Sequence, residues 1–308
     1  MSDRPTLSVL MPVFNAERYL AEALESILAQ TFRDFEFIVV DDGSTDRSLP
    51  ILQRFAKEDF RIKIVSRPNT GIVGALNDGL AVASGEYIAR MDADDIALPN
   101  RLAIQLHYME THPEIVAIGS SASMADPSGR PLKDFKACTD PQTLRHNIVE
   151  IKDIGVIHPT LMVRRNILNR VGGYRQHYNL VEDFDLFFRL LDEGELSNVP
   201  EVLLVYRQHQ ASTNSKKHQI QRVLMLQCLT EHRQRWNLPA LESPLAPPQV
   251  AAPGAQHITW AFWAVEGGHP ATAFRHAALA CLRSGLAPQA RRCLNYVVHT
   301  LCHRPKPS

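Results

Sequence analysis

Apolar residues in the first third of the chain recur with two different periods, and the two periods alternate. The stretch 7–13 is almost entirely apolar, which is typical of a buried strand. The stretch 16–30 places Leu20, Leu24 and Ile27 on one face, which is helical spacing. The same alternation continues, with strands expected at 7–13, 35–40, 62–65 and 86–91 and helices at 16–30, 49–57 and 72–83. It predicts an α/β fold with a mostly parallel, doubly wound sheet.

The pattern is less regular in the rest of the chain. Helices are expected at 99–112, 165–171 and 182–192, and strands at 115–121, 160–163 and 202–206. Later come a helix, a stretch rich in Pro and Ala, and two or three helices rich in Ala and Leu. We therefore expect an α/β domain at 1–213, a helix packed on it at 214–238, a linker at 239–256 and a C-terminal helical region at 257–308.

The composition excludes several classes of protein. Lys+Arg and Asp+Glu each number 33, so the chain lacks the basic surplus that nucleic-acid binders carry. No stretch approaches the roughly 18–20 apolar residues of a membrane span, and the polar start does not resemble a signal peptide. The five cysteines are scattered, which favours reduced thiols. We expect a cytoplasmic globular protein with no nucleic-acid partner.

Acidic residues follow directly after the second and the fourth predicted strands. Asp41 and Asp42 come first, and Asp92, Asp94 and Asp95 come later. In a parallel sheet, ligands bind beyond the carboxyl ends of the strands. Carboxylate oxygens there suit Mg²⁺ or Mn²⁺, which would bridge phosphate oxygens. The alternative is that both groups cap the helices that follow. For the second group we favour a metal site, because three adjacent carboxylates repel one another without a cation.

Two more polar groups occupy comparable positions. Glu182 and Asp183 open a predicted helix, where acids are also favoured by the helix dipole, so a structural role competes with that of a general base. Arg207 and His209 follow the last predicted strand, although a lone histidine is more often a surface or packed residue. Taken together, acids and a histidine at one edge of the sheet favour a metal–diphosphate site. Its members would be Asp41, Asp92, Asp94, Asp183 and His209.

The chain resembles the family 2 glycosyltransferases, an inverting family with the GT-A nucleotide-diphospho-sugar transferase fold. The likeness covers about residues 7–213 and rests on short motifs in the family's order. They read Pro12-Val13-Phe14-Asn15, Asp41-Asp42-Gly43-Ser44-Thr45-Asp46, Asn69-Thr70-Gly71 with Ala75-Leu76-Asn77, Gly85-Glu86-Tyr87-Ile88, Asp92-Ala93-Asp94-Asp95, His158-Pro159, Gly172-Gly173-Tyr174, Glu182-Asp183 and Tyr206-Arg207-Gln208-His209. The resemblance implies this fold with a C-terminal helical extension.

The resemblance also implies roles for single residues. Pro12, Val13 and Glu17 would line the base and ribose, Asp41 would accept from the pyrimidine N3–H, and Asn69, Gly71 and Asn77 would border the nucleotide. Asp92 would hold the ribose or a metal-bound water, and Asp94 would coordinate Mn²⁺ or Mg²⁺. His209 would be a second metal ligand or a diphosphate contact, with Arg207 nearby. Asp183 would be the catalytic base, with Glu182 as the second choice.

The implied reaction moves one sugar, with inversion, from a nucleotide-sugar to an acceptor hydroxyl. UDP is the expected carrier, and N-acetylglucosamine, galactose and glucose all stay open as the sugar. The expected products are surface polysaccharides or lipid-linked glycans, and a lipid-linked acceptor implies peripheral contact with the inner face of the membrane. The aromatic residues of 257–308 are expected to pack in a core, and we hypothesise that this region caps the acceptor side.

Three other functions compete with this one. Processive members of the family carry Gln-x-x-Arg-Trp beside membrane spans, but here the sequence reads His232-Arg233-Gln234-Arg235-Trp236, which favours a non-processive enzyme. A nucleotidyltransferase would carry a Gly-rich basic loop after the first strand, and Pro12-Val13-Phe14-Asn15 has neither feature. An inactive sugar-nucleotide-binding scaffold would not need Asp94, Asp183 and His209 together.

Overall fold

The computed structural model describes residues 4–150, 155–209, 218–239 and 253–302, and within them the strands form one sheet. The strands are β1 (Leu7–Val13), β2 (Phe35–Asp41), β3 (Ile62–Ser66), β4 (Tyr87–Arg90), β5 (Ile96–Ala97), β6 (Ile115–Ala125), β7 (Pro131–Phe135), β8 (Met162–Arg164) and β9 (Glu195–Arg207). Their order is β3-β2-β1-β4-β8-β6-β9-β5, with β7 paired to β6. β1 to β4 pair in parallel, which confirms the α/β prediction, whereas β8 runs antiparallel to both β4 and β6.

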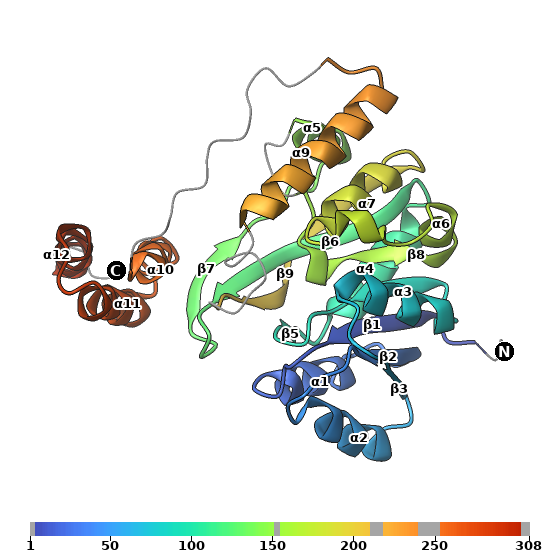
Figure 1. Ribbon diagram of the computed structural model, residues 1–308, viewed down its shortest axis with the longest axis horizontal. Helices are drawn as coiled ribbons and strands as arrows, with labels where there is room; N and C mark the ends of the chain where they lie inside the picture. The colour runs from blue at the N-terminus through green and yellow to red at the C-terminus, as the bar shows by residue number, and fades with distance from the viewer. Residues whose placement is uncertain (1–3, 151–154, 210–217, 240–252, 303–308) are drawn as a thin grey trace. The chain divides into compact units, whose positions relative to one another are not determined.

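Apart from the helix at 141–149, which was not predicted, the helices follow one another in the order expected from the sequence (Figure 1). They are α1 (Leu20–Leu28), α2 (Ser48–Glu58), α3 (Ile72–Val82), α4 (Arg101–Thr111), α5 (Pro141–Val149), α6 (Arg165–Arg170), α7 (Glu182–Leu190) and α9 (His218–Arg235), then α10 (Ala255–Glu266), α11 (Pro270–Arg283) and α12 (Pro288–Cys302). α1 begins four residues later than predicted. The backbone N–H groups of Ala16 and Glu17 instead donate to side chains of Ser48 and Asp46.

Both faces of the parallel strands are buried. Leu10 on β1 and Ile38 on β2 belong to the same apolar cluster as Leu76 on α3. Successive side chains of a strand point to opposite faces, and the alternate residues Val9 and Phe37 are also fully buried. Helices therefore cover the sheet on two sides, as a doubly wound arrangement requires. The carboxyl ends of β1, β2 and β4 are left to carry the polar residues.

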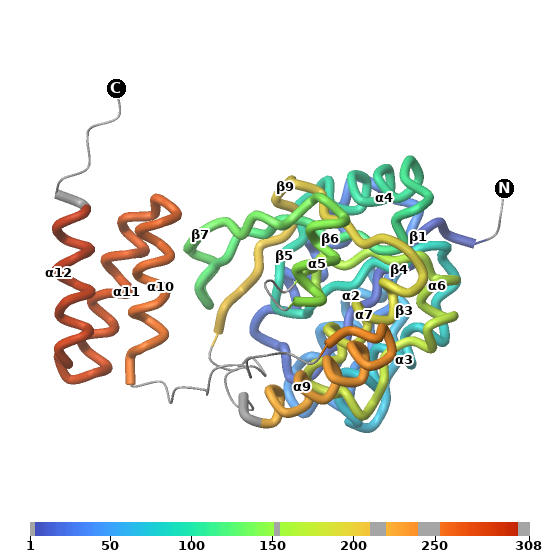
Figure 2. The backbone as a smooth tube through the Cα atoms, turned by 90° about the horizontal axis from the view of Figure 1, so that it is seen from above, coloured from blue at the N-terminus to red at the C-terminus, as the bar shows by residue number. Residues whose placement is uncertain are grey.

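The chain divides into two compact units. The first comprises residues 1–122, 136–205 and 213–244, and the second comprises 123–135, 206–212 and 245–308. Within the first unit, α9 packs against α7 (Figure 2). The four parts predicted along the chain stay a prediction. No helix among the described residues is long and apolar enough to cross a membrane.

The second unit has a core of small residues. Trp260 on α10 and Leu132 on β7 pack with alanines of α10 and α11 in one cluster. Beside this cluster, two buried imidazoles and a carboxylate form a chain: Nδ1 of His257 lies 3.0 Å from Nδ1 of His276, whose Nε2 lies 3.2 Å from a carboxylate oxygen of Asp126. If Nε2 of His276 donates to Asp126, then His257 donates to His276, so both rings are accommodated as neutral groups.

We expect these two histidines to make the second unit acid-sensitive. Burial lowers the pKa of His257 to about 4, and the neighbouring His276 and the charges of Arg283 and Arg275 add to this. The unfolded chain therefore takes up protons below its histidine pKa of about 6.5, while the folded unit does so only near pH 4. Lowering the pH from about 6.5 to about 4 should therefore reduce the free energy of unfolding of this unit by about 3 kcal/mol. The stabilisation is complete above about pH 6.5.

Hydrogen exchange of α10 and α11 amides between pH 4 and pH 7 measures this loss. His257→Gln should flatten the dependence, whereas His299→Gln, at an exposed position on α12, should leave it unchanged. Equal pH dependence in the wild type and in His257→Gln would contradict the assignment.

Candidate active site

The turn after β4 gathers three carboxylates. Asp92, Asp94 and Asp95 place carboxylate oxygens within 4.8 Å of one another between β4 and β5. Asp95 is fully buried, whereas Asp92 and Asp94 are partly exposed. This set consists only of hard oxygen donors, which fits Mg²⁺ or Mn²⁺ and fits soft metals poorly. The structure therefore brings together the residues that the sequence predicts after the fourth strand.

A buried cation, Arg90, ends β4 directly before this turn. It is not among the site residues that the sequence predicts. Its Nη2 lies 2.6 Å from Oδ1 of Asp92, and only 4% of its side chain is exposed. Nε and Nη1 of Arg90 are buried without a hydrogen-bond partner among the described residues. Fully buried Arg101 donates to the Arg90 carbonyl oxygen at 2.6 Å, which fixes the end of β4. The sequence signal was a lone cation in an apolar strand, directly before the acidic turn.

The first turn of α7 brings Glu182 and Asp183 to the same place. Burial raises the pKa of Asp92, the charges of Asp94 and Asp183 raise it further, and Arg90 opposes them. Burial also raises the pKa values of Glu182 and Asp183, and Arg90 opposes part of this rise. Arg90 therefore contacts the acidic turn through Asp92 and lies close enough to the two α7 carboxylates to act on their charge. The charge of Asp183 acts on Asp92, so the two predicted groups are near each other, and their roles in one site stay a prediction.

The two α7 carboxylates have different surroundings. Glu182 is buried, accepts a hydrogen bond from the backbone N–H of Leu180 at 2.9 Å, and has its pKa raised to about 7 by burial and by Asp183. Leu180 has a φ of 92°, an unfavourable conformation for a side chain with a Cβ, so the entry to α7 is strained. Asp183 is partly exposed, and its Oδ1 accepts from the backbone N–H of Phe184 at 2.8 Å.

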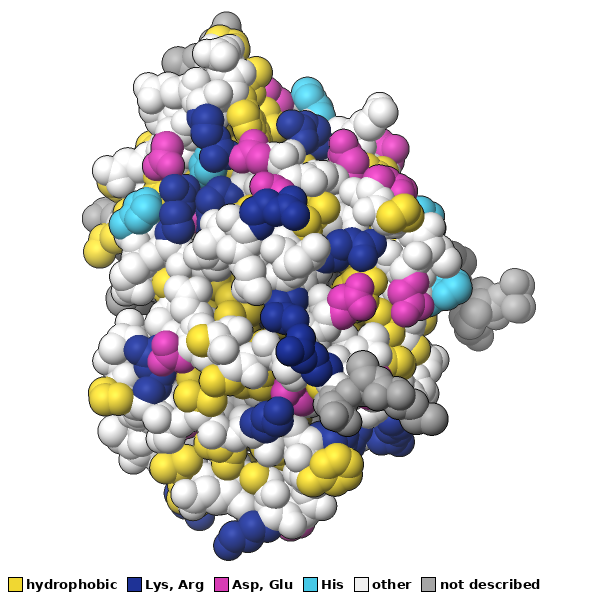
Figure 3. Space-filling view, turned by 90° about the vertical axis from the view of Figure 1, so that its right-hand side faces the viewer, with side chains coloured by type: hydrophobic (Ala, Val, Ile, Leu, Met, Phe, Trp, Pro, Cys, Tyr) yellow, Lys and Arg dark blue, Asp and Glu magenta, His cyan; other side chains and the backbone are white. Residues whose placement is uncertain are grey.

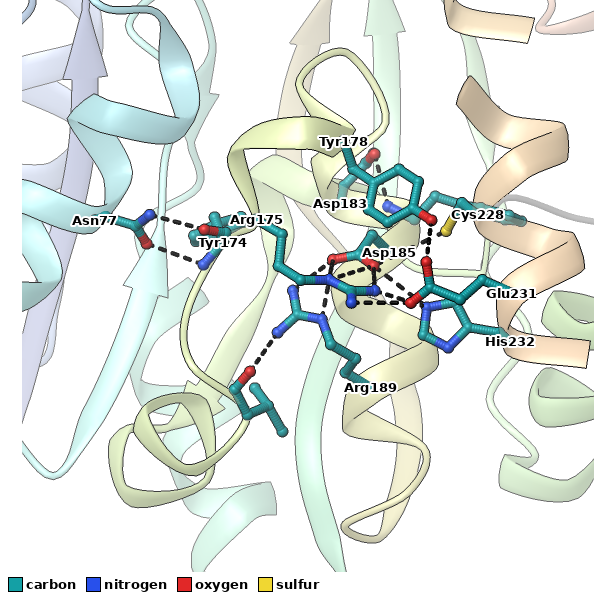
Figure 4. A network of polar contacts seen from close by, with 12 residues as sticks. Asn77, Tyr174, Arg175, Tyr178, Asp183, Asp185, Arg189, Cys228, Glu231 and His232 are labelled. Carbon is teal, nitrogen blue, oxygen red and sulfur yellow. Dashed lines mark hydrogen bonds and ion pairs between the residues drawn. The ribbon is translucent and has the colours of Figure 1, made fainter. Parts of the chain in front are cut away.

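A buried polar network joins α7 to the loop before it and to α9 (Figure 4). Asp185, which is fully buried, accepts hydrogen bonds from Arg175 at 3.0 Å and from Arg189 at 2.7 Å and 2.9 Å. Nε2 of His232 on α9 lies 3.2 Å from the same carboxylate. Burial raises the pKa of Asp185, but the hydrogen bonds from His232 and the two arginines outweigh it and keep that pKa well below its usual range.

The same carboxylate is an unsuitable metal ligand. Asp185, Cys228 and His232 place possible ligand atoms within 4.8 Å of one another. However, two guanidinium groups already compensate the charge of Asp185, and a divalent cation beside them would be repelled. We therefore assign this group a structural role, in which it joins α7 to α9.

The loop before α7 is fixed to α3 by Asn77. Its amide donates to the carbonyl oxygen of Tyr174 at 2.8 Å and accepts from the Tyr174 N–H at 2.9 Å. A Cβ on Gly173 would come within 2.7 Å of this amide oxygen, which explains a glycine there. The phenol oxygen of Tyr174 lies 3.0 Å from Nε2 of His158, whose pKa burial and Arg90 hold well below its usual range. Asn77 thus positions a loop, and its contact with a nucleotide stays a prediction.

The ends of β1 and β2 carry the residues assigned to the nucleotide. Val13 pairs in register with Asp41, which is buried and accepts from the Ser44 N–H at 3.3 Å. Asp42, which the resemblance left without a role, accepts from the N–H groups of Thr70 at 3.1 Å and Gly71 at 2.9 Å. It therefore ties the loop that follows β3 to the end of β2.

The other predicted residues of this group are placed as follows. Pro12 is partly buried on β1, exposed Asn69 precedes Gly71, and exposed Glu17 accepts from the Arg47 N–H at 3.0 Å. Gly71 directly precedes α3 and has a φ of 90°. Arg207 ends β9 and His209 follows it, both in the second compact unit, so their roles at the diphosphate or metal stay predictions.

Comparisons with known proteins show the family to which the chain is similar. The family profile described as glycosyl transferase family 2 matches residues 8–172. The O-antigen biosynthesis glycosyltransferase WbnJ of Escherichia coli is 32% identical over 67% of this chain and 81% of its own length.

Solved structures show the same fold. TarS 1-349 of S. aureus in complex with UDP-GlcNAc superposes with a TM-score of 0.59 at 18% identity, covering 96% of this chain and 91% of that one. The mannosyltransferase PcManGT of Pyrobaculum calidifontis in complex with GDP-Man and Mn²⁺ gives 0.54 at 19% identity, covering 97% and 86%. The predicted GT-A fold with a C-terminal helical region is confirmed by these likenesses and by the sheet order.

Proposed function

The chain belongs to glycosyl transferase family 2, and from that premise we propose that it is an inverting glycosyltransferase. It would move one sugar from a nucleotide-sugar to an acceptor hydroxyl. One observation carries the proposal: the carboxylates of the turn after β4 and Asp183 on α7 act on one another and on the buried Arg90, which supports a cation site and a base close to each other. Inversion requires the acceptor to attack from the face opposite the leaving group, where the base would act, and the cation would stabilise the leaving diphosphate.

In this proposal Asp183 is the base and Glu182 supports it. Asp183 is partly exposed, so an acceptor hydroxyl can reach it, and its charge acts on Asp92. Glu182 is buried, and with a pKa of about 7 it is partly protonated at neutral pH. A carboxylate that takes the acceptor's proton in the transition state contributes roughly 10²–10⁴ in rate.

Asp94, with Asp92 and Asp95, would hold Mn²⁺ or Mg²⁺, and His209 would be a further ligand or diphosphate contact. Bound there, the ion would stabilise the negative charge that develops on the leaving diphosphate. Arg90 would keep Asp92 in place through its 2.6 Å contact, whether or not the ion is bound. The Mn²⁺ in the PcManGT complex supports a divalent ion for this chain.

The nucleotide would lie at the ends of β1 and β2. Pro12, Val13 and Glu17 would contact the base and ribose, and Asp41 would accept from the pyrimidine. Asn69, Gly71 and Asn77 would border the nucleotide, with Gly71 held by its hydrogen bond to Asp42, and Arg207 would contact the diphosphate. UDP is the proposed carrier, and the UDP-GlcNAc complex of TarS supports it.

The proposed acceptor is a hydroxyl of a surface polysaccharide or a lipid-linked glycan. The likeness to WbnJ, an O-antigen biosynthesis glycosyltransferase, supports this acceptor class. An enzyme for such acceptors would work at the inner face of the cytoplasmic membrane. The hypothesis that residues 257–308 cap the acceptor side stays a prediction.

Thermal unfolding with UDP, GDP, dTDP and CDP, each with and without Mn²⁺, tests the donor site. A nucleotide at about 100 times its dissociation constant should add about 2.7 kcal/mol, which raises the unfolding temperature by about 5–10 °C. We expect the shift with UDP, only in the presence of Mn²⁺, and its loss in Asp94→Asn. Asp134→Asn, at an exposed position on β7, should keep the full shift.

Each contrary result has a clear meaning. A shift with none of the nucleotides would contradict the donor site. Binding of a nucleotide-sugar with neither transfer nor hydrolysis would support an inactive scaffold instead of an enzyme. Release of pyrophosphate from a nucleoside triphosphate would support a nucleotidyltransferase.

A further inference from the structure

The charges of this chain are strongly segregated along the sequence. Of its 33 basic residues, six follow Glu266, and none of its 33 acidic residues does. Residues 267–308 therefore carry a net charge of +6 and the rest of the chain −6, with histidines neutral. By contrast, Figure 3 shows a face of the molecule where basic and acidic side chains are interspersed. The net charge of the whole chain is therefore zero although its C-terminal segment is basic.

The helices of this segment leave an apolar stripe uncovered. Their buried side is made of small residues such as Ala273, Ala277 and Ala280. On the opposite side of α11, Phe274 is 49% exposed and Leu282 is 78% exposed, and Leu286 beyond the helix is 52% exposed. With Ala278 these residues recur every four positions, so they form one row along the helix.

Basic side chains border the stripe. Arg275 and Arg283 are exposed on α11, and Arg291 and Arg292 are exposed on α12. Nε of Arg291 donates to the carbonyl oxygen of Leu286 at 2.6 Å, which places this guanidinium beside the end of the stripe. None of the four forms an ion pair within the described part of the chain, which fits a segment without acidic residues.

We propose that the exposed side of α11, with the adjoining arginines of α12, binds an anionic membrane surface. Basic and apolar side chains on one helix face suit a lipid interface, where lipid phosphates meet the cations and the acyl region takes the apolar groups. A second copy of the chain would bring two faces of the same positive charge together. Nucleic acid would satisfy the arginines but would offer little to the aliphatic Leu282 and Leu286. The inference does not depend on the proposed function, because it requires neither donor nor turnover.

Sedimentation of the full chain with lipid vesicles tests the proposal. Vesicles of phosphatidylcholine with about one third phosphatidylglycerol should bind the protein at least tenfold more tightly than vesicles of phosphatidylcholine alone, and 0.5 M salt should weaken the binding. Phe274→Ser with Leu282→Ser, and separately Arg275→Glu with Arg283→Glu, should each weaken it at least tenfold. One double substitution removes apolar side chains and the other reverses charges, both at exposed positions. If one of them disturbs folding, the other still tests the proposal.

Matched changes on α2 and in the turn that follows it serve as controls. Phe60→Ser removes an apolar side chain that is 94% exposed, and Arg54→Glu with Lys57→Glu reverses two exposed charges, without an expected effect on vesicle binding. Equal binding to both kinds of vesicle, absence of binding, or equal losses in the controls would overturn the proposal. So would a dimer that the α11 changes dissociate, or binding to an RNA or DNA oligonucleotide without binding to vesicles.

Discussion

Asp183→Asn is expected to lower kcat by about 10²–10⁴ and to leave the UDP- and Mn²⁺-dependent rise in unfolding temperature unchanged. An amide cannot accept the proton of the acceptor, but its oxygen can still take the 2.8 Å hydrogen bond from the Phe184 N–H, so the start of α7 should keep its form. The measurement is the rate at which nucleoside diphosphate is released from the nucleotide-sugar that the unfolding screen selects.

Glu182→Gln is the matched control for this change. It removes the neighbouring carboxylate in the same turn and keeps an acceptor for the 2.9 Å hydrogen bond from Leu180. We expect a loss of kcat well below that of Asp183→Asn. The reverse order would assign the base to Glu182, and similar small losses in both would show that neither acts as the base.

The sequence located most of the acidic site because acidic side chains that follow buried strands are a local pattern. Asp92 and Asp94 lie where that pattern predicts them, after β4, and Asp183 lies at the start of the helix that the apolar spacing predicts. It missed Arg90, which looked like part of an apolar strand, and it did not show that Asp42 would hold a loop from β3. Both depend on contacts between distant segments, which periodicity does not encode.

Longer elements were missed for a related reason. β9 covers Glu195–Arg207, although only 202–206 was predicted, because polar residues interrupt its apolar pattern. Two of them, Ser197 and Asn198, are nevertheless buried, and they donate to the carbonyl oxygens of Thr139 and Cys138, each at 2.8 Å. A buried polar residue with a distant partner cannot be distinguished from a loop residue in a single sequence.

His232 shows how a departure from a motif can have a structural cause. In the sequence it stands where a processive enzyme would carry the first Gln of its motif. In the structure it is buried, stacks on the ring of Phe188 with centroids 4.8 Å apart, and contacts Asp185. Its surroundings belong to the junction of α7 and α9, so the residue helps to position the helix that carries Asp183.

Asp185→Ala should therefore be the most destabilising single change in this junction. It would leave Arg189 and His232 buried without their carboxylate, along with partly buried Arg175. Breaking a buried ion pair in this way costs about 3–5 kcal/mol, or about 10 °C in the unfolding temperature of a unit of this size. Chemical denaturation measures the loss. Because Asp185 lies two residues after Asp183, we also expect kcat to fall at temperatures where the variant is still folded.

Glu231→Ala provides the comparison within the same network. Glu231 lies 3.0 Å from Arg175 and accepts from the Tyr178 hydroxyl at 2.5 Å, but its side chain is 48% exposed, so its removal should cost only about 1 kcal/mol. Water can replace Glu231, whereas it cannot reach the buried carboxylate of Asp185. Equal losses in the two variants would mean that the arginines find other partners when Asp185 is removed. The hold of α9 on α7 would then depend on apolar packing such as that of Phe188, and not on the buried carboxylate.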